Sequence, residues 1–333
     1  MADLNAERRD GRRPAQQGHR KLELAAHAAW LYYIANNTQE EIATKLNVSR
    51  QAAQRLVALA ASEKLIKFRL DHPLSHCIAL AETLRDKFAL SLCEVVPSPV
   101  GSGSPYSGLG VCAATHLETY LMAKSPAILA FSSGRTLRAA VEQLPSMEQP
   151  QHKIVSTVGN MSHYGLAGRY EVVMHLSERI GSQAYPLPVP TVANSVEERD
   201  LLQTQKAFVT VRSLAEQAKA TFVGMSHIAW NSPLHEDGFI NDAELTELIE
   251  QGAIGEIAGW AYDAQGGLLT TGTNTRVASV PLEQPAQRSI IGVAGGLNKG
   301  EAILAALRGQ LITGLITDEA AAEVILAKAS FMP

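Results

Sequence analysis

The sequence predicts an α/β protein in two parts: a small helical part that ends in a strand, at residues 21–72, and a larger α/β part with a mainly parallel sheet, at residues 76–330. Two observations predict this division. Three helical patterns with polar cap residues between them follow one another before residue 65, and strand and helix patterns alternate from residue 76 onward. A chain of 333 residues is long enough for two domains.

The composition is that of a globular protein. Hydrophobic residues make up 46% and charged residues 19% of the chain, a balance that excludes a disordered or fibrous protein. No apolar run reaches the roughly 18 residues that a membrane-spanning helix needs, and the residues near Met1 do not resemble a signal peptide. The three cysteines, Cys77, Cys93 and Cys112, are scattered, which argues against a disulfide framework. We therefore expect a soluble cytoplasmic protein without a membrane partner.

Charge is unevenly distributed along the chain. Residues 1–70 contain 12 basic and 7 acidic side chains, a net charge of +5, and the remainder contains 17 basic and 26 acidic ones, a net charge of −9. A basic head suggests that this end meets a polyanion. Residues 1–20 lack hydrophobic periodicity and are expected to form a disordered basic arm, which either is solvated or contacts phosphates.

The helical part has the pattern of a helix-turn-helix. Apolar residues fill most of a helical surface from Leu22 to Ala35. Thr38-Gln39-Glu40-Glu41 then has the form of a capping box, in which the Thr38 oxygen accepts a backbone N–H bond and Glu41 reaches back. A short helix follows, Asn47-Val48 makes the turn, and Ser49 caps the next helix.

The helix after Ser49 carries the side chains expected of a groove-reading helix. Its apolar stripe consists of Ala53, Leu56, Val57 and Ala60, at spacings of i, i+3, i+4 and i+7. The opposite side presents Gln51, Gln54 and Arg55, with Arg50 on the flank. Glutamine can form paired hydrogen bonds to adenine, and arginine binds guanine or phosphate.

A strand with basic side chains follows and predicts a wing. In Leu65–Leu70 the residues alternate, so Lys67 and Arg69 face outward, where they would lie near the backbone of a duplex. The alternative is a plain helical subdomain with solvated polar faces, but the ordered set of caps, turn, polar face and basic strand favours a winged helix-turn-helix that binds double-stranded DNA. The predicted DNA-binding residues are Thr38, Gln39, Ser49, Arg50, Gln51, Gln54, Arg55, Lys67 and Arg69.

From residue 76 onward strands and helices alternate, with a loop rich in Pro, Gly and Ser at Pro97–Gly110. Such alternation predicts a mainly parallel sheet that is covered on both faces. The strands are expected at Leu92–Val96, Ile128–Phe131, Ile154–Val158, Thr221–Met225, Ile257–Tyr262 and Ile290–Val293. The helices are expected at His76–Phe88, Val111–Met122, Leu137–Leu144, Val211–Ala220, Ala243–Glu250, Ala302–Arg308 and Ala320–Ala329.

Two segments that follow strands could bind an anionic small molecule, because ligands of such sheets bind beyond the carboxyl ends of the strands. Ser132-Ser133-Gly134-Arg135-Thr136 offers hydroxyls and backbone N–H groups at a helix start, which either cradle an anion or simply cap the helix. Lys299 precedes another helix, where a cation opposes the helix dipole by roughly 0.3–1 kcal/mol. Arg135 has the same conflict, and an anion between the two cations would remove it, although Glu301 could also neutralise Lys299.

Other candidates are weaker. Asp263 follows the expected strand that ends at Tyr262, and its carboxylate could accept hydrogen bonds from a sugar hydroxyl or serve the turn. Gly159 and Asn160 lie in a turn after the strand Ile154–Val158. The histidines at 227 and 235 flank a loop with Glu236 and Asp237, which is more typical of a polar surface loop than of acid–base chemistry. No zinc spacing, P-loop or dinucleotide motif is present, so neither a metal nor a cofactor is expected.

Several segments together resemble the SorC/DeoR family of bacterial sugar-responsive transcriptional regulators, over nearly all of residues 22–330. Within that family the chain looks most similar to the type that regulates polyol catabolism, such as that of erythritol. The segments that carry the resemblance are Ala28-Ala29-Trp30-Leu31-Tyr32-Tyr33, Thr38-Gln39-Glu40-Glu41-Ile42-Ala43, Ser49, Arg55-Leu56, Gly134-Arg135-Thr136-Leu137, Ala306-Leu307-Arg308-Gly309 and Leu315-Ile316-Thr317-Asp318-Glu319.

The resemblance implies an effector domain of the sugar-phosphate isomerase and deaminase type. It implies a homo-oligomer, dimer or tetramer, whose DNA binding responds to a sugar, polyol or sugar phosphate held by Gly134, Arg135, Thr136, Asp263 and Lys299. The chain departs from the family at Phe131-Ser132-Ser133, where a glycine-rich stretch with Trp or His is common. The resemblance therefore does not fix which effector binds or whether it is phosphorylated. The alternative is a sugar-phosphate isomerase or deaminase, which would need a general base; we expect a regulator and not an enzyme.

Overall fold

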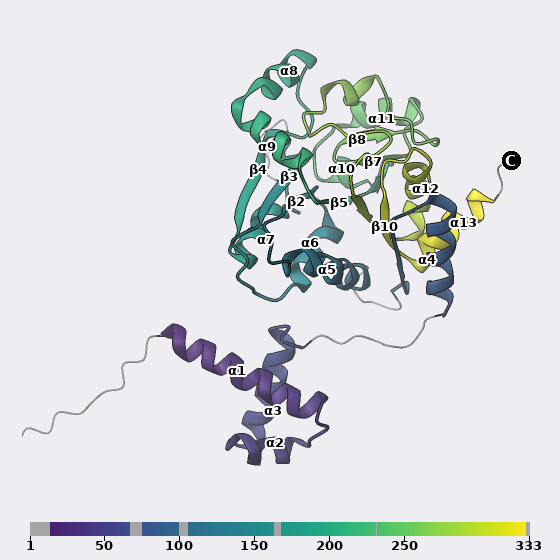
Figure 1. Ribbon diagram of the computed structural model, residues 1–333. Coiled ribbons are helices and arrows are strands. Elements are labelled where there is room, and N and C mark those ends of the chain that lie inside the picture. Colours follow the sequence, from purple (N-terminus) through teal and green to yellow (C-terminus); the bar gives the residue numbers. More distant parts are fainter. Residues whose placement is uncertain (1–13, 67–74, 100–105, 163–167, 231, 331–333) are drawn as a thin grey trace, which may run out of the picture. The chain divides into compact units, whose positions relative to one another are not determined.

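The computed structural model describes residues 14–66, 75–99, 106–162, 168–230 and 232–330, with the side chains of residues 14–19 and 160 outside the description. The chain divides into two compact units, Met1–Asp71 and His72–Pro333 (Figure 1).

The N-terminal unit contains three helices, α1 (Pro14–Tyr33), α2 (Gln39–Leu46) and α3 (Arg50–Ser62). Both predicted caps are present. The Thr38 hydroxyl accepts a bond from the Glu41 N–H at 3.3 Å and the Thr38 N–H donates to the Glu41 carboxylate at 2.7 Å, while the Ser49 hydroxyl accepts from the Ala52 N–H at 3.1 Å. The helices enclose a small core that consists of Ala28, Leu31, Ile42, Ala53 and Val57.

Two features of this unit differ from the sequence-based prediction. The first helix begins at Pro14, inside the segment assigned to the arm, because proline suits the first turn of a helix. The sequence did not predict this start, since the polar residues after Pro14 show no apolar period. Leu65 and Ile66 lie outside any strand, although Ile66 packs on Ala25, Ala29 and Ala60. Lys67 and Arg69 lie outside the described residues, so the wing stays a prediction.

The second unit is built on a seven-stranded parallel sheet, as the alternating pattern predicts. In order across the sheet the strands are β1 (Leu92–Val96), β10 (Gly314–Asp318), β9 (Ile290–Val293), β5 (Ala220–Gly224), β2 (Ile128–Phe131), β3 (Lys153–Met161) and β4 (Gln183–Pro190).

Helices cover both faces of this sheet (Figure 1). Alternate residues of a strand point to opposite faces, so Ile290 and Leu315 pack in one core and Ile291 and Ile316 in the other. One face is covered by α5 (Ser107–Leu121), α6 (Arg135–Gln143) and α7 (Val173–Ile180). The other is covered by α4 (Ser75–Phe88), α9 (Lys206–Glu216), α12 (Gly300–Arg308) and α13 (Glu319–Ala329).

A small antiparallel sheet lies beside the parallel one. The segment predicted as a single strand, Ile257–Tyr262, is instead a hairpin, because Ala258 and Gly259 both have positive φ angles, of 53° and 87°. The sheet consists of β6 (Ser226–His227), β7 (Gly255–Ile257) and β8 (Trp260–Tyr262). The remaining elements are α8 (Val196–Thr204), α10 (Pro233–Glu236), α11 (Asp242–Glu250), and the short 3-10 helices η1 (Gly272–Arg276) and η2 (Leu297–Lys299).

Other boundaries differ by a few residues. The expected loop Pro97–Gly110 ends earlier, because α5 begins at Ser107. The strand expected at Ile154–Val158 continues as β3 to Met161, so Gly159 and Asn160 lie in a strand and not in a turn. A side chain at Gly159 would place its Cβ 2.4 Å from the Val189 carbonyl oxygen, and glycine therefore allows β3 and β4 to approach closely.

Candidate functional site

A cavity of about 470 Å³ lies at the carboxyl ends of the parallel strands. Segments that follow β1, β2, β5 and β9 line it, as does Asp318 at the end of β10. Within the sheet, β3 and β4 lie on one side of β2, and β5 and β9 lie on its other side. The cavity thus lies where the strand order reverses, which is the usual place for a ligand in sheets of this kind.

The start of α6 forms one wall of the cavity. Four residues that are predicted to bind the effector line it: Ser133, Gly134, Arg135 and Thr136. Gly134 occupies the N-cap position with a φ of 138°, a conformation that favours glycine, and no side chain caps the helix. The first backbone N–H groups of α6 therefore have no side-chain acceptor, and a helix start of this kind suits an anion.

Arg135 reaches across the cavity wall to acidic and aromatic groups. Its Nη2 lies 3.3 Å from the Glu236 carboxylate and 3.7 Å from that of Asp237, and its guanidinium lies 5.1 Å from the centre of the Tyr170 ring. Burial opposes its charge, but hydrogen bonds with Tyr170, Glu236 and Tyr106 raise its pKa, so it stays a cation. Among the described residues its Nε is buried and has no hydrogen-bond partner.

Lys299 also lines the cavity, at the start of α12. Its Nζ donates to the Met225 carbonyl oxygen at 3.0 Å. Burial lowers the pKa of Lys299, with a further contribution from Arg135, while Glu256 opposes the change. Two basic side chains therefore line the same cavity from two helix starts.

Acidic side chains and one histidine complete the lining. Burial raises the pKa of both Asp237 and Glu256, and burial together with Lys299 lowers the pKa of His227. In the part of the chain that the structure describes, the buried Nδ1 of His227 has no hydrogen-bond partner. The Asp318 carboxylate accepts bonds from the backbone N–H groups of Gly296 and Ala321, so it holds the loop after β9 in place.

Some predicted effector-binding residues do not line the cavity. The hydroxyl of Ser132 is buried and accepts the Gly224 N–H at 2.9 Å, so it joins the ends of β2 and β5. Asp263 follows β8, which belongs to the antiparallel sheet, and its carboxylate closes a turn by accepting the N–H groups of Gln265 and Gly267. Gly159 lies within β3, and the side chain of Asn160 is outside the described residues.

Other lining residues were not predicted. His227 and Asp237 were interpreted as part of a surface loop, yet both line the cavity. His227 lies three positions after β5, so its place after a strand was the signal that could have indicated it. Tyr170 and Glu256 come from segments that no sequence pattern connects to the cavity.

The N-terminal unit exposes the predicted polar face of α3. Gln51, Gln54 and Arg55 are exposed, while Ala53, Val57 and Ala60 are buried on the other side. The Nε of Arg55 donates to the Gln51 carbonyl oxygen at 3.3 Å, which leaves the rest of its guanidinium toward solvent.

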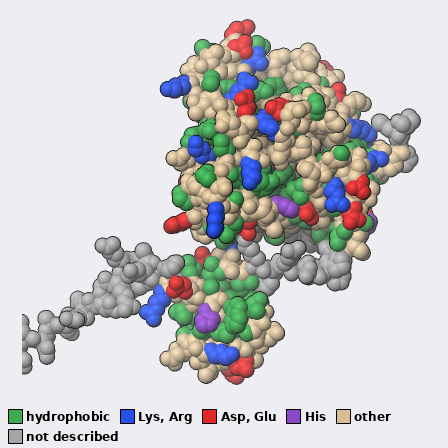
Figure 2. All heavy atoms as spheres, in the orientation of Figure 1, with side chains coloured by type: hydrophobic (Ala, Val, Ile, Leu, Met, Phe, Trp, Pro, Cys, Tyr) green, Lys and Arg blue, Asp and Glu red, His purple; other side chains and the backbone are tan. Residues whose placement is uncertain are grey.

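The other predicted DNA-binding residues that the structure describes are at the helix starts. Arg50 is exposed and lies 3.3 Å from Glu40, Thr38 and Ser49 are exposed caps, and Gln39 is half-buried. Apolar side chains also reach the surface of this unit (Figure 2), and the large ones on α1 are Trp30 and Tyr32; Ile34 follows directly after the helix. In the described part of the chain no helix is long and apolar enough to cross a membrane.

These two units define a class of protein: a helix-turn-helix joined to an α/β domain with a ligand cavity at the strand ends, the organisation of a DNA-binding regulator under the control of a small molecule.

Comparison with known proteins gives the family. The model of a family described as "Putative sugar-binding domain" matches residues 72–327. The erythritol catabolism regulatory protein EryD of Brucella abortus is 32% identical over 305 residues, which cover 92% of this chain and 96% of that protein. The deoxyribonucleoside regulator of Bacillus subtilis is 26% identical, with 92% and 98% covered. The crystal structure of the full-length sorbitol operon regulator SorC from Klebsiella pneumoniae has a TM-score of 0.71 at 26% identity and covers 92% of this chain and 98% of that one. The chain belongs to the SorC/DeoR family of sugar-binding transcriptional regulators.

Proposed function

We propose that the protein regulates transcription of genes for carbohydrate or polyol catabolism, and that a sugar, polyol or sugar phosphate in the cavity sets its affinity for operator DNA. The names of its relatives, which include regulators of erythritol catabolism and of a sorbitol operon, support this class of ligand. We expect the protein to act in the cytoplasm, where its DNA lies.

The observation that carries the proposal is the pair of cations at the two helix starts. Arg135 and Lys299 both line the cavity, and each opposes the dipole of its own helix by roughly 0.3–1 kcal/mol. A phosphate between them would remove that conflict and accept hydrogen bonds from the guanidinium of Arg135, which lines the cavity. We therefore expect a phosphorylated sugar or polyol to bind more tightly than its unphosphorylated parent.

In the structure, Glu236 and Asp237 occupy the place of an anion. Their carboxylates lie 3.3 Å and 3.7 Å from Arg135, so a phosphate must compete with them. Binding would then release α10 and the residue after it from the wall of the cavity. This exchange gives the ligand-binding domain two states that a ligand can distinguish, which control of DNA binding requires.

The DNA-binding face is that of α3, with Gln51, Gln54 and Arg55 directed to bases and phosphates. We expect a homo-oligomer, dimer or tetramer, in which two such units read half-sites about 34 Å apart or a multiple of this distance. The exposed apolar side chains of Trp30 and Ile34 support association between copies. Size-exclusion chromatography with light scattering measures the assembly directly.

The second candidate is an enzyme that isomerises or deaminates a sugar phosphate. His227 and Asp237 favour it, since both line the cavity and both have shifted pKa values. The relatives named above are all regulators, which favours regulation over catalysis.

One set of measurements on the full-length protein separates the two functions. A thermal-shift screen of polyols, sugars and their phosphates finds the ligand, because a compound that binds the native state raises the melting temperature. A gel shift on the promoter DNA that adjoins the protein's own gene, with and without this ligand, tests regulation, and incubation of the ligand with the protein tests turnover. A ligand-dependent gel shift without turnover supports the proposal, and turnover without a gel shift overturns it.

A further inference from the structure

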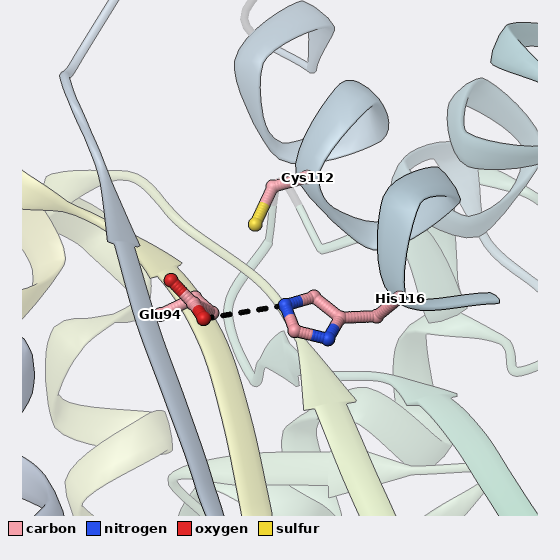
Figure 3. Close-up of side chains that lie close together, drawn as sticks. All are labelled: Glu94, Cys112 and His116. Carbon is pink, nitrogen blue, oxygen red and sulfur yellow. Dashed lines mark ion pairs between the residues drawn. The ribbon is translucent and has the colours of Figure 1, made fainter. Parts of the chain in front are cut away.

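Three side chains of the types that bind metal ions lie together outside the cavity. Glu94 on β1, and Cys112 and His116 on α5, each place one ligand atom within 4.8 Å of the other two (Figure 3). The Nε2 of His116 lies 3.3 Å from the Glu94 carboxylate. None of the three lines the cavity.

The fold explains why these side chains meet. Cys112 and His116 are four residues apart, so they project from the same face of α5, one turn from each other. On β1 the neighbours of Glu94, Cys93 and Val95, pack into the core beneath α4 and α13. Because successive side chains of a strand alternate, Glu94 points to the opposite face, which α5 covers.

The three groups are partly buried, which separates them from an ordinary surface cluster. The side chain of His116 is 26% exposed and that of Glu94 is 45% exposed. Burial, and then the nearby Glu94, raise the pKa of the Cys112 thiol to about 12. A bound cation would stabilise the thiolate, the form that burial and Glu94 disfavour.

We propose that Glu94, Cys112 and His116 form a zinc site with three protein ligands and one open position. Thiolate, imidazole and carboxylate are the ligands of Zn²⁺, at about 2.3 Å for sulfur and about 2.0–2.2 Å for nitrogen and oxygen. Ligand atoms that surround such an ion lie within about 4 Å of one another, so small side-chain rotations suffice here. Thiolate and imidazole together select zinc over magnesium or calcium, which prefer oxygen ligands.

Binding displaces one proton. The thiol of Cys112 loses its proton to the solvent as sulfur bonds to the ion, Glu94 binds as the carboxylate, and neutral His116 binds through the nitrogen that faces Glu94. The ion would connect β1 to α5, the two elements next to Ser98 and Tyr106 of the cavity lining.

A second cluster among the described residues provides the control. His76, Glu319 and Glu323 also lie within 4.8 Å of one another, but His76 and Glu323 are exposed and the cluster contains no sulfur ligand. Burial raises the pKa of the nearby Cys77 thiol, and the charges of Glu319 and Glu323 raise it further. The test must therefore distinguish a metal–thiolate signal that comes from Cys112 from one that comes from Cys77.

The test uses Co²⁺ as a probe for the zinc site of the full-length protein, stripped of metal by a chelator and kept reduced. Wild-type protein should bind one equivalent of Co²⁺ with a thiolate-to-cobalt charge-transfer band, and Zn²⁺ should remove the band by displacement. Cys112→Ser should abolish the band and Cys77→Ser should retain it. His116→Ala should weaken Zn²⁺ binding by at least about 10- to 100-fold, the loss seen even for groups that only support a ligand.

Two results overturn the proposal: absence of a charge-transfer band in the wild type, or its persistence in Cys112→Ser. The wild-type titration decides the question even if a variant fails to fold. Circular dichroism melts of the metal-free variants show whether each one is folded.

Discussion

Replacement of Arg135 by alanine tests how the cavity recognises an anion. In the structure the guanidinium already contacts Glu236 and Asp237, and its side chain is 28% exposed. A hydrogen bond to a charged group contributes about 1.5–3 kcal/mol, and both the competing carboxylates and the solvent reduce the net value. We therefore take the lower half of this range, about 1.5–2 kcal/mol, which corresponds to a Kd for a phosphorylated ligand that is roughly 10- to 30-fold higher.

Isothermal titration calorimetry with a sugar phosphate and its unphosphorylated parent measures this effect. Binding of the parent compound should change less, because its hydroxyl groups carry no charge that attracts the guanidinium of Arg135. Arg138→Ala is the matched control, because Arg138 lies on the same helix, pairs with Glu142 and does not line the cavity. The reasoning is refuted if both ligands lose the same affinity, or if Arg138→Ala has the effect expected of Arg135→Ala.

Three further predictions concern DNA binding, stability and pH. Arg55→Ala should weaken operator binding by ~1–3 kcal/mol, about 5- to 150-fold, and leave ligand binding intact; an unchanged operator Kd at fixed salt in a gel shift would contradict the role of α3. Ile42 is fully buried, so Ile42→Ala should lower the free energy of unfolding of the N-terminal unit by ~2–5 kcal/mol in urea melts, and a change below about 1 kcal/mol would mean that this core does not hold the helices. Burial and Lys299 lower the pKa of His227, so the folded state binds the proton less well than the unfolded state, and stability should fall as the pH decreases below about 6.5. His227→Gln should reduce this dependence of the melting temperature on pH, and an unchanged slope would exclude His227 as its source.

Local chemistry made the N-terminal unit predictable. The capping box at Thr38 and the cap at Ser49 involve residues three apart in sequence, and both form as expected. The apolar stripe of α3 likewise fixes its buried face from spacing alone. The start of α1 at Pro14 was missed because the polar residues that follow it in the sequence show no apolar period.

The cavity was predictable only where a residue directly follows a parallel strand or begins a helix. Arg135 and Lys299 meet this condition, and both line the cavity. Asp263 does not line the cavity because its strand, β8, belongs to a different, antiparallel sheet, which the sequence pattern could not distinguish. Glu256 comes from the hairpin of that sheet, and only long-range packing brings it to the cavity.

The central claim is that a ligand in the cavity changes the affinity of the protein for DNA. Fluorescence anisotropy of labelled operator DNA, titrated with full-length protein in the absence and in the presence of saturating ligand, tests it directly. A coupling free energy of ~1–3 kcal/mol predicts that the operator Kd changes by about 5- to 150-fold, and that the operator changes the ligand Kd by the same factor. An operator Kd that is the same with and without ligand would contradict the claim.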